Sequence, residues 1–227
     1  MPATTATIPH EQDYASTRKF AEDILQGRDE THGFGHCAIV YRHAMGIFDD
    51  ILSEKEPENV RLLQIIEKKV DARKVIAISA YLHDVLDHKY DSTQATADKM
   101  EAHIKTVCSE EEAKWVYFIM EHVSYSAQKK GKFKIEEIPE DMRLLRNIVS
   151  DADKLEAIGM DGVHRCLDFT KEKNPQYSQE ECRKHAAIHC DEKLLLLCGD
   201  FIYTAPGKRR AEPLHQDVVE WRSKVTI

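Results

Sequence analysis

The stretch ARKVIAISAYLHDVLDH, residues 72–88, decides the fold class of this chain. Apolar side chains occur nearly all round its helical projection, which predicts a central, buried helix rather than an amphipathic surface helix. Within it, burying His83 and Asp84 without partners would cost on the order of several kcal/mol. A divalent cation would satisfy both groups, because imidazole and carboxylate suit Mn, Fe, Zn, Ni or Mg. The alternative is a structural hydrogen bond between the two side chains at the end of the helix.

Helical periodicity continues on both sides of this stretch. Apolar residues recur at three- and four-residue spacing, and alternating strand patterns are nearly absent. Residues 128–140 contain Gly131, Pro139 and several lysines, which predicts a loop. We therefore expect an all-α, single-domain helical fold over 13–227, preceded by a flexible tail at 1–12. The other expected helices cover 13–26, 36–52, 92–107, 109–127, 140–150, 152–172, 180–198 and 208–225.

Composition and charge narrow the function class. The chain has 227 residues and a formal net charge of −8 at pH 7. Such a chain is not typical of a duplex-nucleic-acid binder, although a few local cations or a metal can still bind a nucleotide. The six cysteines form no Cys-x-x-Cys pair, which favours reduced thiols. Apolar runs are too short for a transmembrane helix and no signal segment is evident, so we expect a cytoplasmic protein without a membrane partner.

Two further positions carry chemistry-bearing side chains next to apolar helical patterns. His36 follows two glycines at the start of a helix and faces the apolar stripe of that helix. Asp151 and Asp153 follow the apolar run at 144–149. We expect Asp151 to cap the start of the next helix, and Asp153 to lie one turn inside it and face the interior. The alternative is that both aspartates only cap the helix and complement its dipole.

The order of these positions is distinctive. His36, His83-Asp84 and Asp153 follow one another on separate helices, and this order resembles the HD-domain superfamily of metal-dependent phosphohydrolases. Residues 36–44, 82–87 and 152–155 look like the first, second and last motifs of that superfamily. Four longer segments are similar to a subgroup of small stand-alone HD hydrolases, whose bacterial members include nucleotide (dNTP) pyrophosphohydrolases. These segments are 87–90, 122–126, 151–159 and 189–195, and the whole resemblance spans about 20–225.

The resemblance implies a fold and a metal site. It implies the helical HD-domain fold and one divalent ion held by His36, His83, Asp84 and Asp153. Asp153 is preferred over Asp151, because the ligand of the family directly precedes a basic residue and a leucine. Manganese is the first expectation, with Mg, Co, Ni, Fe or Zn as alternatives. Two imidazoles and two carboxylates leave positions open for water and a phosphate oxygen, as a catalytic site requires.

The resemblance also implies catalytic residues. Asp87 would orient or deprotonate the attacking water, or would instead hold a ligand histidine from outside. Lys89 would meet a substrate phosphate, with a plain surface salt bridge as the alternative. His122 would contact phosphate or act as an acid, with a core histidine as the alternative.

Four residues are candidates for substrate binding. His32 would lie at the mouth of the cleft, and Lys154 would meet a phosphate or form a surface salt bridge. Arg165 and Lys193 match positions of the subgroup and would bind phosphate or hold the acidic ligands.

The expected function is therefore divalent-metal-dependent hydrolysis of a small phosphorylated metabolite, with a (deoxy)nucleoside triphosphate as the leading substrate. Alternatives are a non-catalytic metal- or nucleotide-binding sensor, a phosphomonoesterase or phosphodiesterase, a helical interaction protein and a two-iron oxygenase. The acidic surface permits a homodimer, but no heptad seam requires one. The inserted segment at 54–70 and the lysine-rich loop at 128–136 depart from the family pattern and leave the substrate open.

Overall fold

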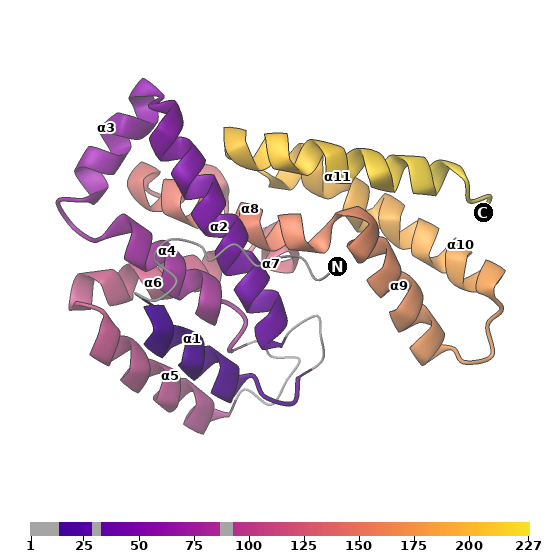
Figure 1. Cartoon of the computed structure of the whole chain (residues 1–227), viewed down its shortest axis with the longest axis horizontal. Helices are drawn as coiled ribbons and strands as arrows, with labels where there is room; N and C mark the ends of the chain where they lie inside the picture. The colour runs from indigo at the N-terminus through magenta and orange to yellow at the C-terminus, as the bar shows by residue number, and fades with distance from the viewer. Residues whose placement is uncertain (1–13, 29–32, 87–92) are drawn as a thin grey trace, which may run out of the picture.

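The computed structural model describes residues 14–28, 33–86 and 93–227, and within these ranges it contains helices and no strand. This confirms the all-α prediction (Figure 1). The expected tail at 1–12 lies outside the described residues. The helices are α1 (Ala15–Ile24), α2 (Phe34–Glu54), α3 (Pro57–Ile66), α4 (Ala72–Leu82), α5 (Gln94–Val107), α6 (Glu110–His122), α7 (Tyr125–Lys129), α8 (Glu140–Ala157), α9 (Gly159–Lys173), α10 (Gln179–His189) and α11 (Ala205–Ser223).

Helix α4 is the centre of the fold, as its sequence predicts. From Val75 to Leu82 every residue is buried. Asp71 caps its start, and the Asp71 side chain accepts a hydrogen bond of 2.9 Å from the amide of Lys74. Helices α2, α6 and α8 pack against α4. A helix surrounded in this way buries apolar surface on all sides. His83, the residue at its C-terminal cap, is therefore buried too, and the partly exposed Asp84 follows it.

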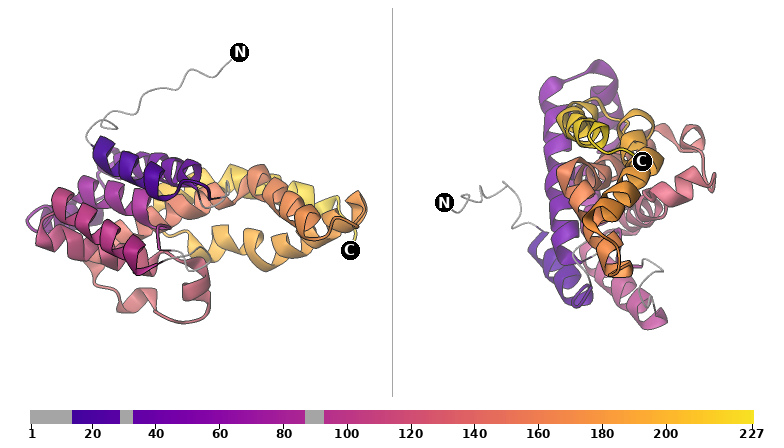
Figure 2. Two further views of the ribbon diagram at one scale, coloured as in Figure 1. Left: turned by 90° about the horizontal axis from the view of Figure 1, so that it is seen from below. Right: turned by 90° about the vertical axis from the view of Figure 1, so that its right-hand side faces the viewer.

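The remaining helices form two ends of an elongated molecule. Helices α1 to α6 gather at one end, while α9, α10 and the second half of α11 extend to the other, as Figure 2 shows. Helix α8 lies between the two ends and packs against α2, α4, α9 and α11. The segment at 54–70 contains α3, which buries Leu62, Leu63 and Ile66 on the side that faces α8. None of the described helices is long and apolar enough to cross a bilayer.

The boundary between α8 and α9 differs from the prediction. We expected a break at Asp151, but α8 continues through Asp151 to Ala157 and the chain turns at Ile158 and Gly159. Gly159 has φ +81°, a left-handed conformation that favours glycine. The prediction that Asp151 caps the start of the next helix is therefore wrong. Aspartate is common at helix starts, but Ser150, Asp151 and Ala152 are buried within one continuous helix.

Residues 190–201 also differ from the expected regular helix. After α10 the chain forms two π-helical turns, η3 (Cys190–Leu194) and η4 (Leu197–Phe201). In the expected loop at 128–140, a short turn η2 (Ile135–Glu137) is the only helical element after α7 ends.

Candidate metal centre

Three helices bring four chemistry-bearing side chains together. His36 lies in the first turn of α2, just after Gly33, where the helix enters the core. His83 ends α4 and Asp84 follows it. Asp153 lies in the last third of α8. Helices α2, α4 and α8 pack against one another, so their contact places residues from three distant segments around one point (Figure 1).

The distances between these side chains suit a single ion. His36 Nε2 lies 3.1 Å from His83 Nε2. Asp153 Oδ1 lies 3.5 Å from His36 Nε2 and 3.7 Å from His83 Nε2. Asp84 approaches each of the two nitrogens to 3.6 Å. Ligands held at about 2.0–2.2 Å from one divalent ion lie roughly 3–3.5 Å from each other, so these separations fit a common ion with little adjustment.

Charge and burial at this cluster favour a bound cation. Burial lowers the pKa of His36, but Asp153 and Glu156 outweigh burial and raise the pKa to about 10. Burial likewise lowers the pKa of His83, while Asp84 and Asp153 raise it overall. Burial raises the pKa of Asp153, but the two histidines hold it well below its usual value. Each shift shows that the carboxylates stabilise positive charge at this point, and a divalent ion would supply that charge.

The accessible side of the cluster is formed by its carboxylates. The side chains of His36 and His83 are only 5% and 2% exposed, whereas those of Asp84 and Asp153 are 22% and 25% exposed. Solvent therefore reaches the cluster past the carboxylates. A closed structural site would use all four protein groups in the interior, whereas this arrangement leaves room for further ligands on one side.

The outer ring nitrogens of the two histidines also have partners. His83 Nδ1 lies 2.9 Å from the carbonyl oxygen of Ala80, which accepts from the ring N–H. His36 Nδ1 lies 3.0 Å from Glu156 Oε2, at hydrogen-bond distance although the ring N–H is not aligned on that oxygen. Both contacts leave Nε2 facing the cluster. Glu156 was not predicted from the sequence, although its position three residues after Asp153 places it on the same face of a helix.

Arg28 is a second residue of this site that was not predicted from the sequence. Its guanidinium donates to the carbonyl oxygens of Asp84 at 2.7 Å and Val85 at 2.8 Å. The planar fork thus binds two successive backbone groups directly after α4 ends. Arg28 follows α1 and is 56 residues from Asp84, so no local sequence pattern indicates this contact.

Asp151 points away from the cluster. Its buried carboxylate accepts hydrogen bonds from the amide of Tyr203 at 2.9 Å, and from the amide and hydroxyl of Thr204 at 2.7 Å each. Thr204 in turn caps α11, because its hydroxyl oxygen accepts from the amide of Gly207. Burial raises the pKa of Asp151 to about 6, although these hydrogen bonds oppose the shift. Asp151 therefore supports the start of α11, a helix that packs against α8.

Lys154 and Arg165 are committed to partners within the protein. Lys154 is buried and its ammonium donates to Ser150 Oγ at 2.7 Å and to the carbonyl of Val123 at 3.2 Å. Burial lowers the pKa of Lys154 to about 8. Arg165 pairs with the Glu156 carboxylate and donates to the Glu156 carbonyl oxygen at 2.5 Å. Lys154 is therefore not available to a phosphate in this structure, and the described hydrogen bonds of Arg165, which is 27% exposed, both go to Glu156.

Lys193 and His122 make their described contacts outside the cluster. Lys193 lies in η3, and its ammonium is 5.6 Å from the ring centroid of Tyr125. His122 donates from Nδ1 to the carbonyl of Phe118 at 2.7 Å, and its ring stacks on Phe118 and meets Phe133 edge-on. The predicted residues His32, Asp87 and Lys89 lie outside the described residues.

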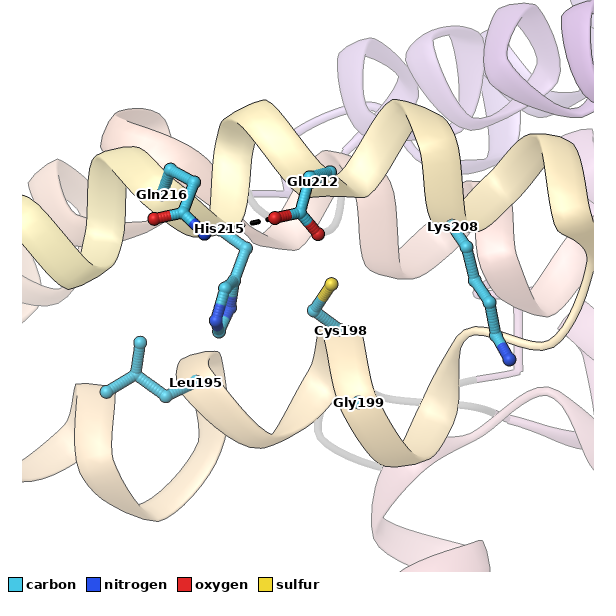
Figure 3. A pocket seen from close by; sticks show the side chains of 7 residues that line it. All are labelled: Leu195, Cys198, Gly199, Lys208, Glu212, His215 and Gln216. Atoms are coloured by element: carbon cyan, nitrogen blue, oxygen red, sulfur yellow. Dashed lines mark hydrogen bonds between the residues drawn. The ribbon is translucent and has the colours of Figure 1, made fainter.

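A separate groove of about 460 Å³ opens between α11 and the η4 turn. In Figure 3, Lys208, Glu212, His215 and Gln216 extend from α11, opposite Cys198 of η4. Gln216 donates to Glu212 at 3.0 Å, so the polar groups of the groove partly satisfy each other. The seven lining residues include none of the four clustered side chains. The groove therefore does not belong to the metal cluster.

Comparisons with known proteins place the fold. No family model matches the sequence, and no curated protein matches it. A Bacillus thuringiensis HD-superfamily hydrolase is 23% identical, with a TM-score of 0.63 and 94% of each chain covered. Bacillus subtilis YpgQ in complex with ADP is 19% identical, with a TM-score of 0.62 over 94% of this chain and 93% of that one. A Lactobacillus plantarum protein is 20% identical, with a TM-score of 0.66 over 94% of this chain and 95% of that one.

Proposed function

We propose that this chain, which has the fold of the HD-superfamily hydrolases, is a divalent-metal-dependent phosphohydrolase that acts on a small phosphorylated metabolite. One observation carries the proposal: His36, His83, Asp84 and Asp153 converge from three helices, with the two facing ring nitrogens 3.1 Å apart and each carboxylate 3.5–3.7 Å from both of them. Two imidazoles and two carboxylates form a donor set that suits Mn, Fe, Co, Ni or Zn, and Mg less well. Manganese is our first choice among these.

The positions of the described residues around the site indicate what each of them does. A bound divalent ion would supply Lewis acidity, polarising a phosphoryl oxygen and lowering the pKa of a water molecule. The two buried histidines hold the inner side of the site, and the partly exposed Asp84 and Asp153 form the side from which a substrate would enter. Arg28 fixes the backbone that carries Asp84. We assign the orientation of the attacking water to Asp87, which follows Asp84 by three residues.

The substrate that we propose is a (deoxy)nucleoside triphosphate. The solved structure of YpgQ, which shares this fold, was determined in complex with ADP. On this chain, Lys129 and Lys193 lie 5.5 Å and 5.6 Å from the ring of Tyr125, which places two cations around one aromatic ring. Together with His32 and Lys89, they are the residues that we assign to phosphate or nucleotide binding.

The test is product formation by metal-stripped protein that has been refilled with Mn, Mg, Co or Ni. The panel contains (d)NTPs, (d)NMPs and a generic phosphodiester, and products are resolved by chromatography. Asp84→Ala is the inactive variant, and Asp217→Ala, which removes an exposed aspartate of α11, is the matched control.

Release of monophosphate and pyrophosphate from a triphosphate, lost in Asp84→Ala and kept in Asp217→Ala, would support the proposal. Cleavage of a different phosphate ester by the same residues would keep the phosphohydrolase and reject the triphosphate. Tight metal binding without turnover of any compound would contradict the catalytic proposal and favour a sensor.

A further inference from the structure

Helix α8 contacts both nitrogens of the His36 ring. Asp153 and Glu156 are one turn apart on α8 and therefore share a face. Asp153 Oδ1 approaches Nε2 to 3.5 Å, and Glu156 Oε2 approaches Nδ1 to 3.0 Å. The ring thus lies between two carboxylates of one helix, and only the inner of its two nitrogens faces the other clustered groups.

The Glu156 carboxylate is itself held in place. Its side chain is only 10% exposed, and Arg165 of α9 pairs with its second oxygen, Oε1. The other branch of the same guanidinium donates to the Glu156 backbone carbonyl at 2.5 Å. Two bonds from one planar group fix both the side chain and the backbone of Glu156.

The turn between α8 and α9 makes this pairing feasible. Gly159 adopts φ +81°, so α8 ends and α9 leaves in a new direction, and Arg165 of α9 lies beside Glu156, nine residues earlier. A side chain at Gly159 would also come within 3.1 Å of Leu214. Gly159 therefore helps to place Arg165 beside Glu156, because a residue with a side chain at this position would strain both the turn and its packing against α11.

The two histidines of the cluster differ in the group that their outer ring nitrogen contacts. The outer nitrogen of His83 meets a neutral backbone carbonyl, that of Ala80, at 2.9 Å. The outer nitrogen of His36 meets a carboxylate that Arg165 holds in place. A carboxylate partner raises the basicity of an imidazole ligand more than a neutral carbonyl does, and it also fixes which nitrogen carries the proton.

We infer that Glu156, anchored by Arg165, is a positioning residue that keeps the proton on His36 Nδ1 and presents Nε2 to the divalent ion. This inference rests on the proposed metal-dependent function. It assigns to Arg165 a role through Glu156 in place of a direct contact with substrate phosphate.

The main test measures Mn²⁺ affinity of the metal-stripped, full-length protein by isothermal titration calorimetry. Glu156→Gln keeps the size of the side chain and removes its charge. We expect its affinity to fall about 10- to 100-fold, the range typical of lost outer-shell partners. Glu140→Gln is the matched control, since it makes the same change on the same helix in an exposed pair with Arg61, and it should bind as wild type does.

Combining two substitutions tests whether Arg165 affects Mn²⁺ binding through Glu156 or independently of it. Arg165→Gln should weaken Mn²⁺ binding less than Glu156→Gln does, because the carboxylate remains near the ring. The variant that carries both changes should bind no more weakly than Glu156→Gln alone, since Arg165 acts through Glu156. If the losses of Mn²⁺ affinity in the two single variants add fully in the double variant, Arg165 does not act through Glu156 and the inference is overturned.

A spectroscopic measurement on the wild-type protein does not depend on any variant folding. Long-range ¹H–¹⁵N correlation spectra of the Zn²⁺-loaded protein report which nitrogen of His36 carries the proton. We expect protonated Nδ1, with weaker or exchanging signal in Glu156→Gln. Protonated Nε2, or unchanged Mn²⁺ affinity in Glu156→Gln, would overturn the inference while the proposed function stands. A wild-type protein that binds no divalent ion would overturn both.

Discussion

The two aspartates of α8 face opposite sides of the helix and have opposite environments. Asp153 lies next to two histidines, is partly exposed, and has a pKa held well below its usual value. Asp151 is fully buried, accepts three hydrogen bonds from Tyr203 and Thr204, and has a pKa raised to about 6. Residues two positions apart on a helix do not share a face. The groups that other helices bring to each face of α8 therefore decide whether a carboxylate is a candidate metal ligand or accepts structural hydrogen bonds.

The largest expected effect comes from Asp153→Ala. We expect Mn²⁺ affinity to fall by at least about 100-fold, beyond the usual loss for an outer-shell partner, and phosphohydrolase turnover to fall to background. Thermal unfolding provides the second readout: saturating Mn²⁺ should raise the midpoint of wild type and leave that of Asp153→Ala unchanged. An Mn²⁺-dependent shift of wild-type size in this variant would remove Asp153 from the ligand set.

Asp151→Ala should instead lower the stability of the fold and leave Mn²⁺ binding nearly unchanged. The change leaves the amides of Tyr203 and Thr204 without their acceptor in a buried place, so we expect a loss of about 3–5 kcal/mol in the free energy of unfolding. Urea titration measures the loss. The remaining folded protein should bind Mn²⁺ with an affinity within a few-fold of wild type, and a loss as large as that of Asp153→Ala would show that the two faces of α8 are not independent.

Gly159→Ala tests the turn that separates the two helices. A left-handed conformation costs a residue with a Cβ about 1–2 kcal/mol, and the added carbon would crowd Leu214 at 3.1 Å. We expect a lower unfolding midpoint in urea and weaker Mn²⁺ binding, because Arg165 would be displaced from Glu156. Gly199→Ala is the control, since a Cβ there meets nothing within 4 Å, and it should change neither quantity.

A smaller, pH-dependent effect is expected at Glu112, which lies far from the α8 carboxylates in the sequence. Burial alone would raise its pKa, but Lys74, whose ammonium lies 2.7 Å away, and the amide of Ser109 lower it overall. A lowered pKa means that the ionised form favours the folded chain. This contribution is complete above the unfolded pKa of about 4.3 and is lost as the pH falls through the lower folded-state value.

We therefore expect Glu112→Gln to lose about 1 kcal/mol of unfolding free energy at pH 6, and to approach wild type as the pH falls below 4. Urea titrations at a series of pH values measure the difference. The exposed Lys105–Glu101 pair is the reference, because Glu101→Gln should be nearly neutral at every pH. A constant difference at all pH values would show that Glu112 acts through packing and not through its charge.

Local sequence patterns predicted most of the helices. They failed at Asp151, because a polar residue after an apolar run can either cap a new helix or lie within a continuous one. The apolar periodicity at 36–52 and 72–88 predicted α2 and α4, because burial of an apolar face is encoded in residue spacing. The same reasoning placed a helix start at Asp151, since aspartate commonly caps helices. Asp151 does support a helix start, but that start belongs to Thr204 of α11, and a partner 53 residues away leaves no local signal.

The candidate site, too, could be predicted only in part from the sequence. The order of His36, His83-Asp84 and Asp153 was sufficient to select two histidines whose facing nitrogens lie 3.1 Å apart and two aspartates that approach both nitrogens to 3.5–3.7 Å. Arg28 and Glu156 were missed. Arg28 contacts a backbone segment, and backbone contacts place little constraint on the sequence of the partner. The role of Glu156 depends on the direction of α9 after the Gly159 turn.

The amino-acid sequence by itself determined that this chain is helical, that α4 is buried, and that two histidines and two aspartates are candidates for one divalent ion. The first two properties follow from apolar spacing, which acts over a few turns of helix. The third follows from residue chemistry together with the resemblance to the HD-domain superfamily. Only the tertiary structure decided that Asp151 accepts hydrogen bonds at the start of α11, that Lys154 is buried, and that Glu156, paired with Arg165, contacts the outer nitrogen of His36. Those facts depend on contacts between helices that are distant in the sequence, where packing sets the direction of each side chain.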